Sequence, residues 1–192
     1  MIHVFGYGSL MWKPGFPHVR AERARLRGFR RSLCILSYCH RGTPERPGLV
    51  FGLEPDPEAV TDGMAFAVDP ALEAEVLACL DAREQPTEVY LRRRLAVELP
   101  ESGATVEAWA YVVRRDHPQY AGRLSIDERL ALIRQGRGRS GACVDYVLDT
   151  LEQLRALGIH DPELEEIAAR LAADGERGEG ADGRVRTPLP AR

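Results

Sequence analysis

A glycine-containing turn near the N-terminus has the residues to bind a negatively charged oxygen. The apolar run Ile2–Gly6 predicts a buried strand, and Tyr7-Gly8-Ser9-Leu10 follows it directly. Glycines at alternate positions let the backbone turn sharply, so that successive N–H groups point at one spot. The turn lacks the third glycine of a dinucleotide-binding loop and the Gly-Lys-Ser/Thr ending of a nucleoside-triphosphate loop. A tight turn with a purely structural role is the alternative.

A carboxylate follows the clearest helix pattern in the chain. A helix is expected over Pro70–Arg83, after an N-cap at Asp69, because Leu72, Val76, Leu77 and Leu80 form one apolar stripe. This helix would end beside Glu84. The negative end of the helix dipole disfavours an ionised carboxylate, which predicts a raised pKa for Glu84. A raised pKa suits a base that must later return its proton. A solvated Glu84, paired with Arg83 or a later arginine, is the alternative.

A third candidate segment precedes another predicted helix. Glycines are frequent over residues 136–141, and the helix is expected over Cys143–Leu157. Free N–H groups at Ser140 or Gly141 could serve an oxygen ligand, and Tyr146 would lie in the first helical turn. The hydroxyl of Tyr146 would then contact a substrate, or else it is a bonded group within the core.

The elements that must position these residues follow one order, strands first and helices mostly later. One long strand or two short ones are expected over residues 24–38, and further strands over residues 49–53, 62–68, 90–99 and 105–114. Further helices are expected over residues 125–135 and 162–173. This order predicts an α+β fold with a strongly bent or closed sheet. Residues 1–173 are expected to form a single domain, and the polar residues 174–192 a disordered tail.

Composition narrows the classes of partner. The chain has 192 residues, of which 44% are hydrophobic and 29% charged, with a formal net charge of −3. This acidic balance argues against nucleic acid and against an anionic membrane, and no apolar run reaches the roughly 18–20 residues of a membrane helix. Of the 26 basic residues only Lys13 is a lysine. That bias reflects either a GC-rich genome or a surface selected to recognise phosphate or carboxylate groups.

The cysteines do not show the spacing of a metal site. They are Cys34, Cys39, Cys79 and Cys143. None forms a Cys-x-x-Cys pair and no histidine lies at ligand spacing, so neither a metal nor another cofactor is expected. Reduced, buried thiols are the simplest expectation. The N-terminus has no export signal, which predicts a cytoplasmic protein.

Several motifs together carry a resemblance to a known family. Val4–Trp12 reads VFGYGSLMW, and His40–Gly48 reads HRGTPERPG. Asp81–Glu84 reads DARE, and two shorter motifs lie at His117–Tyr120 and Ser140–Val147. With these motifs, residues 2–160 resemble the ChaC family of glutathione-specific gamma-glutamylcyclotransferases. One departure is that the family often has an Asn before the last tyrosine, where this chain has Cys143 and its neighbours.

The resemblance implies a small mixed β-barrel with flanking helices and a reaction without a cofactor. In that reaction the α-amine of a gamma-glutamyl group attacks its own side-chain carbonyl. Glutathione, a small-molecule substrate, would release 5-oxoproline and Cys-Gly. The resemblance implies Glu84 as the catalytic base. The residues that it implies for substrate binding are Tyr7, Gly8, Ser9, Leu10, Arg41 and Tyr146.

Other functions remain open at this stage. The substrate could be another gamma-glutamyl amino acid or amine, or the chain could bind such a compound without turning it over. An arginine-rich RNA-binding protein is a third alternative, which the pI near 6.0 disfavours. A monomer or a weak homodimer is expected.

Overall fold

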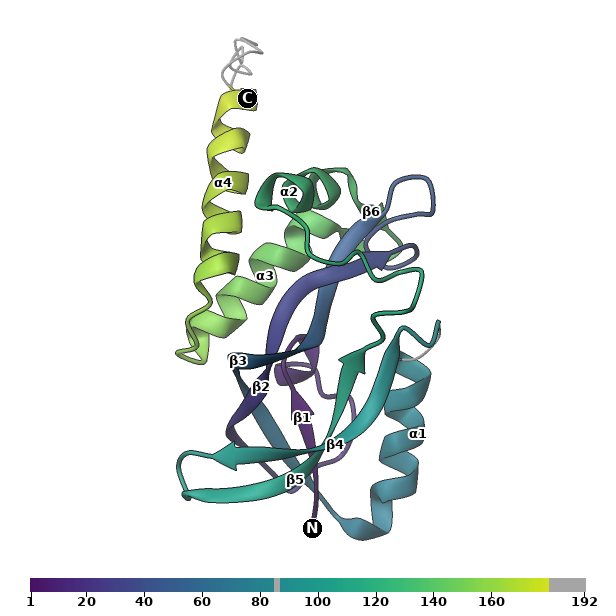
Figure 1. Ribbon diagram of the computed structural model, residues 1–192, viewed down its shortest axis with the longest axis vertical. Coiled ribbons are helices and arrows are strands. Elements are labelled where there is room, and N and C mark those ends of the chain that lie inside the picture. The colour runs from purple at the N-terminus through teal and green to yellow at the C-terminus, as the bar shows by residue number, and fades with distance from the viewer. Residues whose placement is uncertain (85–86, 180–192) are drawn as a thin grey trace, which may run out of the picture.

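The computed structural model describes residues 1–84 and 87–179 and contains a closed five-stranded barrel (Figure 1). The strands are β1 (Ile2–Gly6), β2 (Arg20–Ser37), β3 (Gly48–Val68), β4 (Tyr90–Leu99) and β5 (Ala104–Val113). Their order around the barrel is β1-β3-β2-β4-β5. Strand β1 is parallel to β5, whereas the other neighbouring pairs are antiparallel. The predicted α+β class and mixed barrel are therefore confirmed.

The longest strand differs from the sequence-based expectation. Residues 49–53 and 62–68 were expected as two strands, but both belong to β3, which has 21 residues and pairs with β2 along most of its length. The residues between them contain two prolines, which are uncommon inside strands. They are accommodated at a break in register opposite Gly28, whose φ of 78° only glycine adopts without strain. Because of the bend at this point, the paired strands β2 and β3 extend along two sides of the molecule.

Helices flank the barrel on two sides. Their bounds are α1 (Glu73–Glu84), α2 (Ile126–Gln135), α3 (Cys143–Ala156) and α4 (Pro162–Glu179). A short 3₁₀ turn, η2 (Pro70–Leu72), precedes α1, and the side chain of Asp69 caps it as predicted. Helix α4 continues past Ala173, where the sequence pattern predicts its end, because Gly175 lowers helix propensity without stopping the helix. Residues 180–192 of the expected tail lie outside the described residues.

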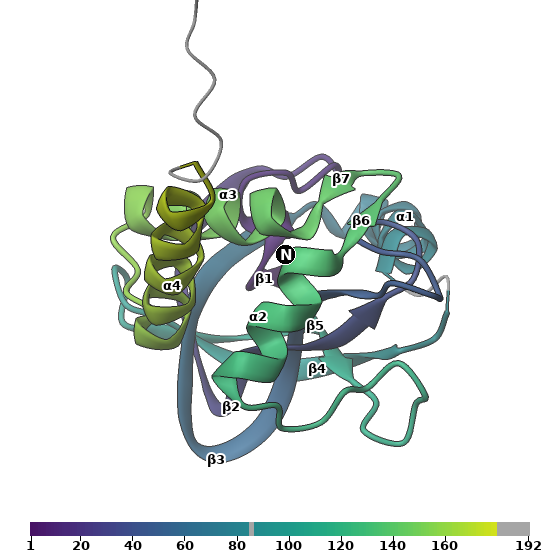
Figure 2. The same ribbon diagram turned by 90° about the horizontal axis from the view of Figure 1, so that it is seen from above.

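Two apolar clusters attach the helices to the barrel. The larger one joins the barrel interior to α2, α3 and α4, which gather toward one end of the molecule in Figure 1. Seen from above, α3 and α4 lie side by side (Figure 2). The smaller one joins α1 to the outside of the barrel through Val76, Leu80, Phe66 and Tyr111. This second contact fixes the end of α1 beside the end of β1. No helix among the described residues is both long and apolar enough to cross a bilayer.

Candidate active site

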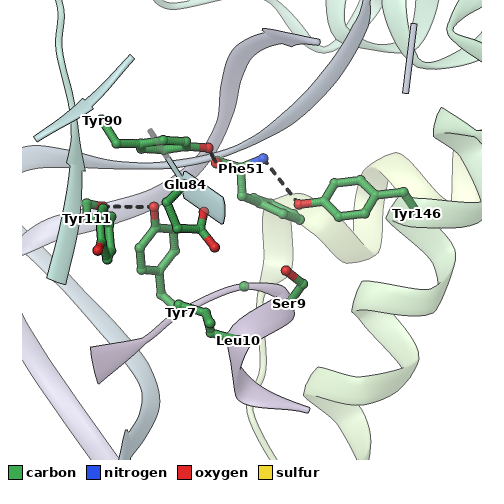
Figure 3. Close-up of a pocket in the computed structure, with 9 residues that line it drawn as sticks. Tyr7, Ser9, Leu10, Phe51, Glu84, Tyr90, Tyr111 and Tyr146 are labelled. Carbon is green, nitrogen blue, oxygen red and sulfur yellow. Dashed lines mark hydrogen bonds between the residues drawn. The ribbon is translucent and has the colours of Figure 1, made fainter. Parts of the chain in front are cut away.

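A small cavity of about 50 Å³ lies where β1, α1 and α3 converge (Figure 3). Its lining residues are Tyr7, Gly8, Ser9, Leu10, Phe51, Glu84, Tyr90, Tyr111 and Tyr146. The structure thus brings together the predicted turn, the predicted base and the predicted tyrosine, from three distant parts of the chain. A wider cleft of about 740 Å³ shares part of this lining, including Ser9, Glu84 and Tyr146.

The turn after β1 presents backbone donors to the cavity. It contains the 3₁₀ helix η1 (Ser9–Met11), closed by a hydrogen bond from the Met11 N–H to the Gly8 carbonyl at 2.9 Å. Gly6 is packed tightly, since an added Cβ would lie 3.0 Å from the Cβ of Leu10. The N–H groups of Gly8, Ser9 and Leu10 donate to no acceptor among the described residues. They are available to an oxygen of a ligand.

Arg83, in the last turn of α1, forms hydrogen bonds to the segment that follows β1. One guanidinium nitrogen, Nη1, donates to the carbonyl of Lys13 at 2.7 Å and to that of Pro14 at 3.3 Å. The other, Nη2, donates to the hydroxyl of Ser9 at 2.9 Å. Nε lies 3.1 Å from Oε1 of Glu84. Arg83 therefore fixes the distance between the carboxylate and the backbone donors.

Glu84 is paired with Arg83, as one sequence-based interpretation expected, and its pKa is raised, as the other expected. Burial raises the pKa of its carboxyl, while the charge of Arg83 opposes the increase. The predicted direction is correct, but desolvation is the main cause rather than the helix dipole that the sequence suggested. The side chain is 20% exposed, so it still reaches the cavity. A partly buried carboxylate with a raised pKa is suited to accept and return a proton.

The tyrosine hydroxyls around the cavity differ in whether they donate or accept a hydrogen bond. Tyr7 donates to the carbonyl of Tyr111 at 2.9 Å, and Tyr90 donates to the carbonyl of Phe51 at 2.7 Å (Figure 3). Tyr146 instead accepts from the N–H of Phe51 at 3.4 Å, so its own proton can be donated into the cavity. Burial raises the pKa of Tyr7 and of Tyr146 above the usual value, which keeps both phenols neutral.

Arg41 lies in the wider cleft and is absent from the lining of the small cavity. Its Nη1 donates to the carbonyl of Ala142 at 3.1 Å, and its guanidinium lies 5.1 Å from the ring centroid of Tyr146. Lys13, Arg83 and Arg139 line the same cleft. The cleft therefore offers cations to an acidic ligand that extends out of the small cavity.

The remaining motifs build the walls of the site. The loop His40–Gly48 packs closely on the segment after α2, because an added Cβ at Gly136 would lie 2.5 Å from the carbonyl oxygen of Arg41. In the motif His117–Tyr120, the Tyr120 hydroxyl donates to the buried Glu54 carboxylate at 2.6 Å. Both motifs hold β2 and β3 in place behind the cleft.

The cysteines are free, with no disulfide among the described residues. The Cys143 thiol donates to the carbonyl of Leu49 at 3.0 Å and accepts from the same residue's N–H at 3.3 Å, which joins α3 to β3. The expectation of four buried thiols is wrong for Cys39 and Cys79, which are exposed. The described residues contain no cluster of potential metal ligands.

Three lining residues had no candidate role in the sequence-based interpretation. Phe51 and Tyr111 sit in strands, where aromatic residues are common core residues, and Tyr90 begins a strand. Their part in the cavity depends on barrel closure. The proximity of Tyr90 to the Glu84 motif was the only local signal.

Comparisons with known proteins agree with this geometry. Residues 2–173 match the family model described as ChaC-like protein. The glutathione-specific gamma-glutamylcyclotransferase 1 of zebrafish is 35% identical over 175 residues, which cover 88% of each chain. The glutathione-specific gamma-glutamylcyclotransferase of Escherichia coli is 28% identical, over 86% of this chain and 71% of the relative.

A solved structure is similar over nearly its whole length. The yeast gamma-glutamylcyclotransferase specific to glutathione superposes with a TM-score of 0.80 and 25% sequence identity. The superposition covers 90% of this chain and 98% of the yeast chain. Because the family model spans most of the sequence and the barrel is shared, the chain belongs to the ChaC-like family.

Proposed function

We propose that this protein is a glutathione-specific gamma-glutamylcyclotransferase in which Glu84 is the general acid/base. The observation that carries the proposal is one partly buried carboxylate that shares a small cavity with backbone N–H groups, which donate to no acceptor among the described residues. Membership of the ChaC-like family supports the choice of substrate, because the zebrafish and Escherichia coli relatives bear this activity in their names.

The chemistry needs only one proton-transfer group. Nucleophile and electrophile belong to the same gamma-glutamyl group, so the cavity has only to hold that group in a folded-back conformation. Glu84 removes a proton from the α-ammonium, and the amine attacks the gamma-carbonyl carbon. As the lactam C–N bond forms and the peptide C–N bond breaks, Glu84 gives its proton to the leaving nitrogen. Glu84 then takes the second proton from the lactam nitrogen and passes it to the released amine, so that Cys-Gly leaves as an ammonium. The products are 5-oxoproline and Cys-Gly, with Glu84 ionised again.

The surrounding groups have separate roles in this proposal. The N–H groups of Gly8, Ser9 and Leu10 bind the carbonyl oxygen that gains charge and the α-carboxylate. The Tyr146 hydroxyl, with its uncommitted proton, orients the reacting group. Tyr7 forms a wall of the cavity. Arg41 lies in the wider cleft, where it would bind a carboxylate of the Cys-Gly part, because a guanidinium matches that anion.

The decisive experiment is direct product detection. Purified protein is incubated with reduced glutathione in the presence of EDTA, and 5-oxoproline and Cys-Gly are measured by mass spectrometry. Wild type should form both products in equal amounts. Glu84→Gln should form neither while still binding glutathione, because the amide cannot accept a proton. Glu75→Gln, at an exposed position of the same helix, is the matched control and should remain active.

A substrate panel separates the alternatives. Glutathione should be turned over faster than gamma-glutamyl-alanine, because the wide cleft gives the Cys-Gly part additional contacts. Equal or faster turnover of gamma-glutamyl-alanine would assign the protein to other gamma-glutamyl compounds. Binding of glutathione by wild type without any product would identify a non-catalytic binding protein.

The cellular setting is part of the same proposal. We infer a single catalytic domain that works in the cytoplasm as a monomer or weak homodimer. None of the four cysteines forms a disulfide within the described structure, which fits a reducing compartment. Light scattering after size-exclusion chromatography measures the oligomeric state, and a stable higher oligomer would contradict this inference.

A further inference from the structure

Arg31 is a buried cation that the proposed reaction does not use. It lies in β2, is only 8% exposed and does not line either the cavity or the cleft. Its Nη1 donates to the carbonyl oxygens of Tyr7 and Asp62, each at 3.1 Å. Its Nε donates to Oδ2 of Asp161 at 3.1 Å. Burying a guanidinium costs free energy unless its N–H groups are hydrogen-bonded. Here Nη1 and Nε bind the backbone of Tyr7 and Asp62 and the side chain of Asp161.

The bond to Tyr7 determines where the next N–H points. The peptide bonds of the described residues are trans, so the Tyr7 carbonyl and the Gly8 N–H point in opposite directions. Arg31 holds the carbonyl, and Gly8 lines the cavity. We propose that Arg31 is a positioning residue that keeps the Tyr7–Gly8 peptide turned with its N–H toward the substrate. A peptide flipped the other way would present a carbonyl to the substrate oxygen, replacing attraction by repulsion.

Little else in the described structure fixes this peptide. Strand β1 pairs with β3 only as far as Gly6, so Tyr7 is the first residue beyond the ladder. An added Cβ at Gly8 would have no atom within 4 Å, so steric contact does not constrain its backbone. The Tyr7 ring is held by its own hydroxyl, but a side-chain contact leaves the peptide plane free to rotate. The guanidinium is therefore the group that selects between the two orientations.

Asp161 in turn fixes Arg31. Its Oδ2 binds the guanidinium, while its Oδ1 accepts from the N–H of Leu164 in the first turn of α4. The guanidinium of Arg31 is thus held between strand β3, through Asp62, and the start of α4, through Asp161. This two-sided support gives the buried side chain one conformation, which a positioning role requires.

The inference rests on the proposed function, and its test compares three variants at a temperature where all are folded. Arg31→Met keeps most of the volume but removes every donor, and should lower kcat/KM for glutathione at least tenfold. Arg31→Lys restores one donor and should recover part of that loss. The matched control is Arg25→Met, which breaks an ion pair between the same strand and Asp62 without touching Tyr7. It should stay within twofold of wild type.

A second readout does not depend on turnover. In glycine-labelled protein, the Gly8 amide resonance is assigned by its loss in Gly8→Ala. It should shift in Arg31→Met and stay in place in Arg25→Met, without any ligand. Activity of Arg31→Met within twofold of wild type, or an unmoved Gly8 resonance, would overturn the inference. If wild type releases no 5-oxoproline, the proposed function fails, while the Gly8 resonance still decides the role of Arg31.

Discussion

Burial makes Glu84 useful for proton transfer and unfavourable for folding at the same time. Its carboxyl has a raised pKa because water is removed from the ionised form. In the unfolded chain the same group has its usual pKa, so the folded state binds this proton more tightly. The stabilisation is therefore present at low pH and is lost as the pH rises through the folded-state pKa.

Glu84→Gln should consequently be more stable than wild type at neutral pH. The amide removes the buried charge, and each kcal/mol gained raises the Tm of a protein of this size by about 2–4 °C. The difference should shrink as the pH approaches about 4, where the glutamate is protonated in both states. Circular dichroism melts across the pH range measure it. A variant less stable than wild type at pH 7 would contradict the assignment of burial as the main cause.

The same shift places the acid limb of the activity profile. The base must be ionised to accept a proton, so kcat/KM should fall on the acid side with a midpoint above the usual carboxyl value of 4.5. Initial rates of 5-oxoproline release against pH measure this midpoint. A midpoint at or below 4.5 would mean that Glu84 is solvated in solution or that another group is the base.

The two hydroxyls bound to Phe51 should respond differently to removal. Tyr146→Phe should lower kcat about tenfold, because it deletes a proton that can reach the substrate, and it should also cost some stability because the Phe51 N–H loses an acceptor. Tyr90→Phe should cost stability, about 1 kcal/mol for a lost hydrogen bond, and leave kcat within a few-fold. Steady-state kinetics and melting of both variants make the comparison. Reversed effects would exchange their roles.

Single residues were predictable where a local rule was broken. Glu84 stands at a helix end that favours cations, and the turn Tyr7–Leu10 follows a strand with unusual glycine content, so both could be selected from sequence. Arg31 could not, because its neighbours in sequence are ordinary strand residues. Its significance comes from Tyr7 and Asp161, which only the folded chain brings to it.

At the scale of elements, the helices and the strands over residues 90–99 and 105–114 were predictable because their signals are local. The 3.6-residue period placed α1 and α2 within one or two residues, apart from the opening 3₁₀ turn that follows the predicted cap at Asp69. The long strand β3 was not predictable in the same way. Its continuity depends on pairing between β2 and β3 across the prolines, which is a tertiary effect.

The join between β1 and β3 should be intolerant of added volume. A Cβ at Gly63 would lie 2.3 Å from the carbonyl oxygen of Gly6 and 2.9 Å from the ring of Phe5. Gly63→Ala should therefore lower stability by about 1–3 kcal/mol and lower activity, because Gly6 leads into the turn. Gly8→Ala meets no atom within 4 Å and should keep the Tm of wild type. Urea denaturation of both variants tests this, and equal stabilities would contradict it.

On the scale of the whole molecule, the site depends on the barrel and on the start of α3. The described contacts of the cavity lie between Tyr7 and Tyr146, and the main apolar cluster extends to Leu171. A chain truncated after Glu179 should therefore retain the Tm and the kcat/KM of wild type within twofold. Parallel melts and rate measurements of the two proteins check this expectation. A clear loss of either quantity would show that residues 180–192 contribute to the catalytic domain.

The tyrosines around the cavity also give the protein an optical signal of its own. The chain has 6 tyrosines, and Tyr7, Tyr90, Tyr111 and Tyr146 all face the same small space. Trp12 lines the cleft outside it. Much of the near-ultraviolet absorption and dichroism of the molecule therefore arises from rings that a ligand must touch. Occupancy of the site can be followed through these bands without a label, including in variants that bind glutathione and release nothing.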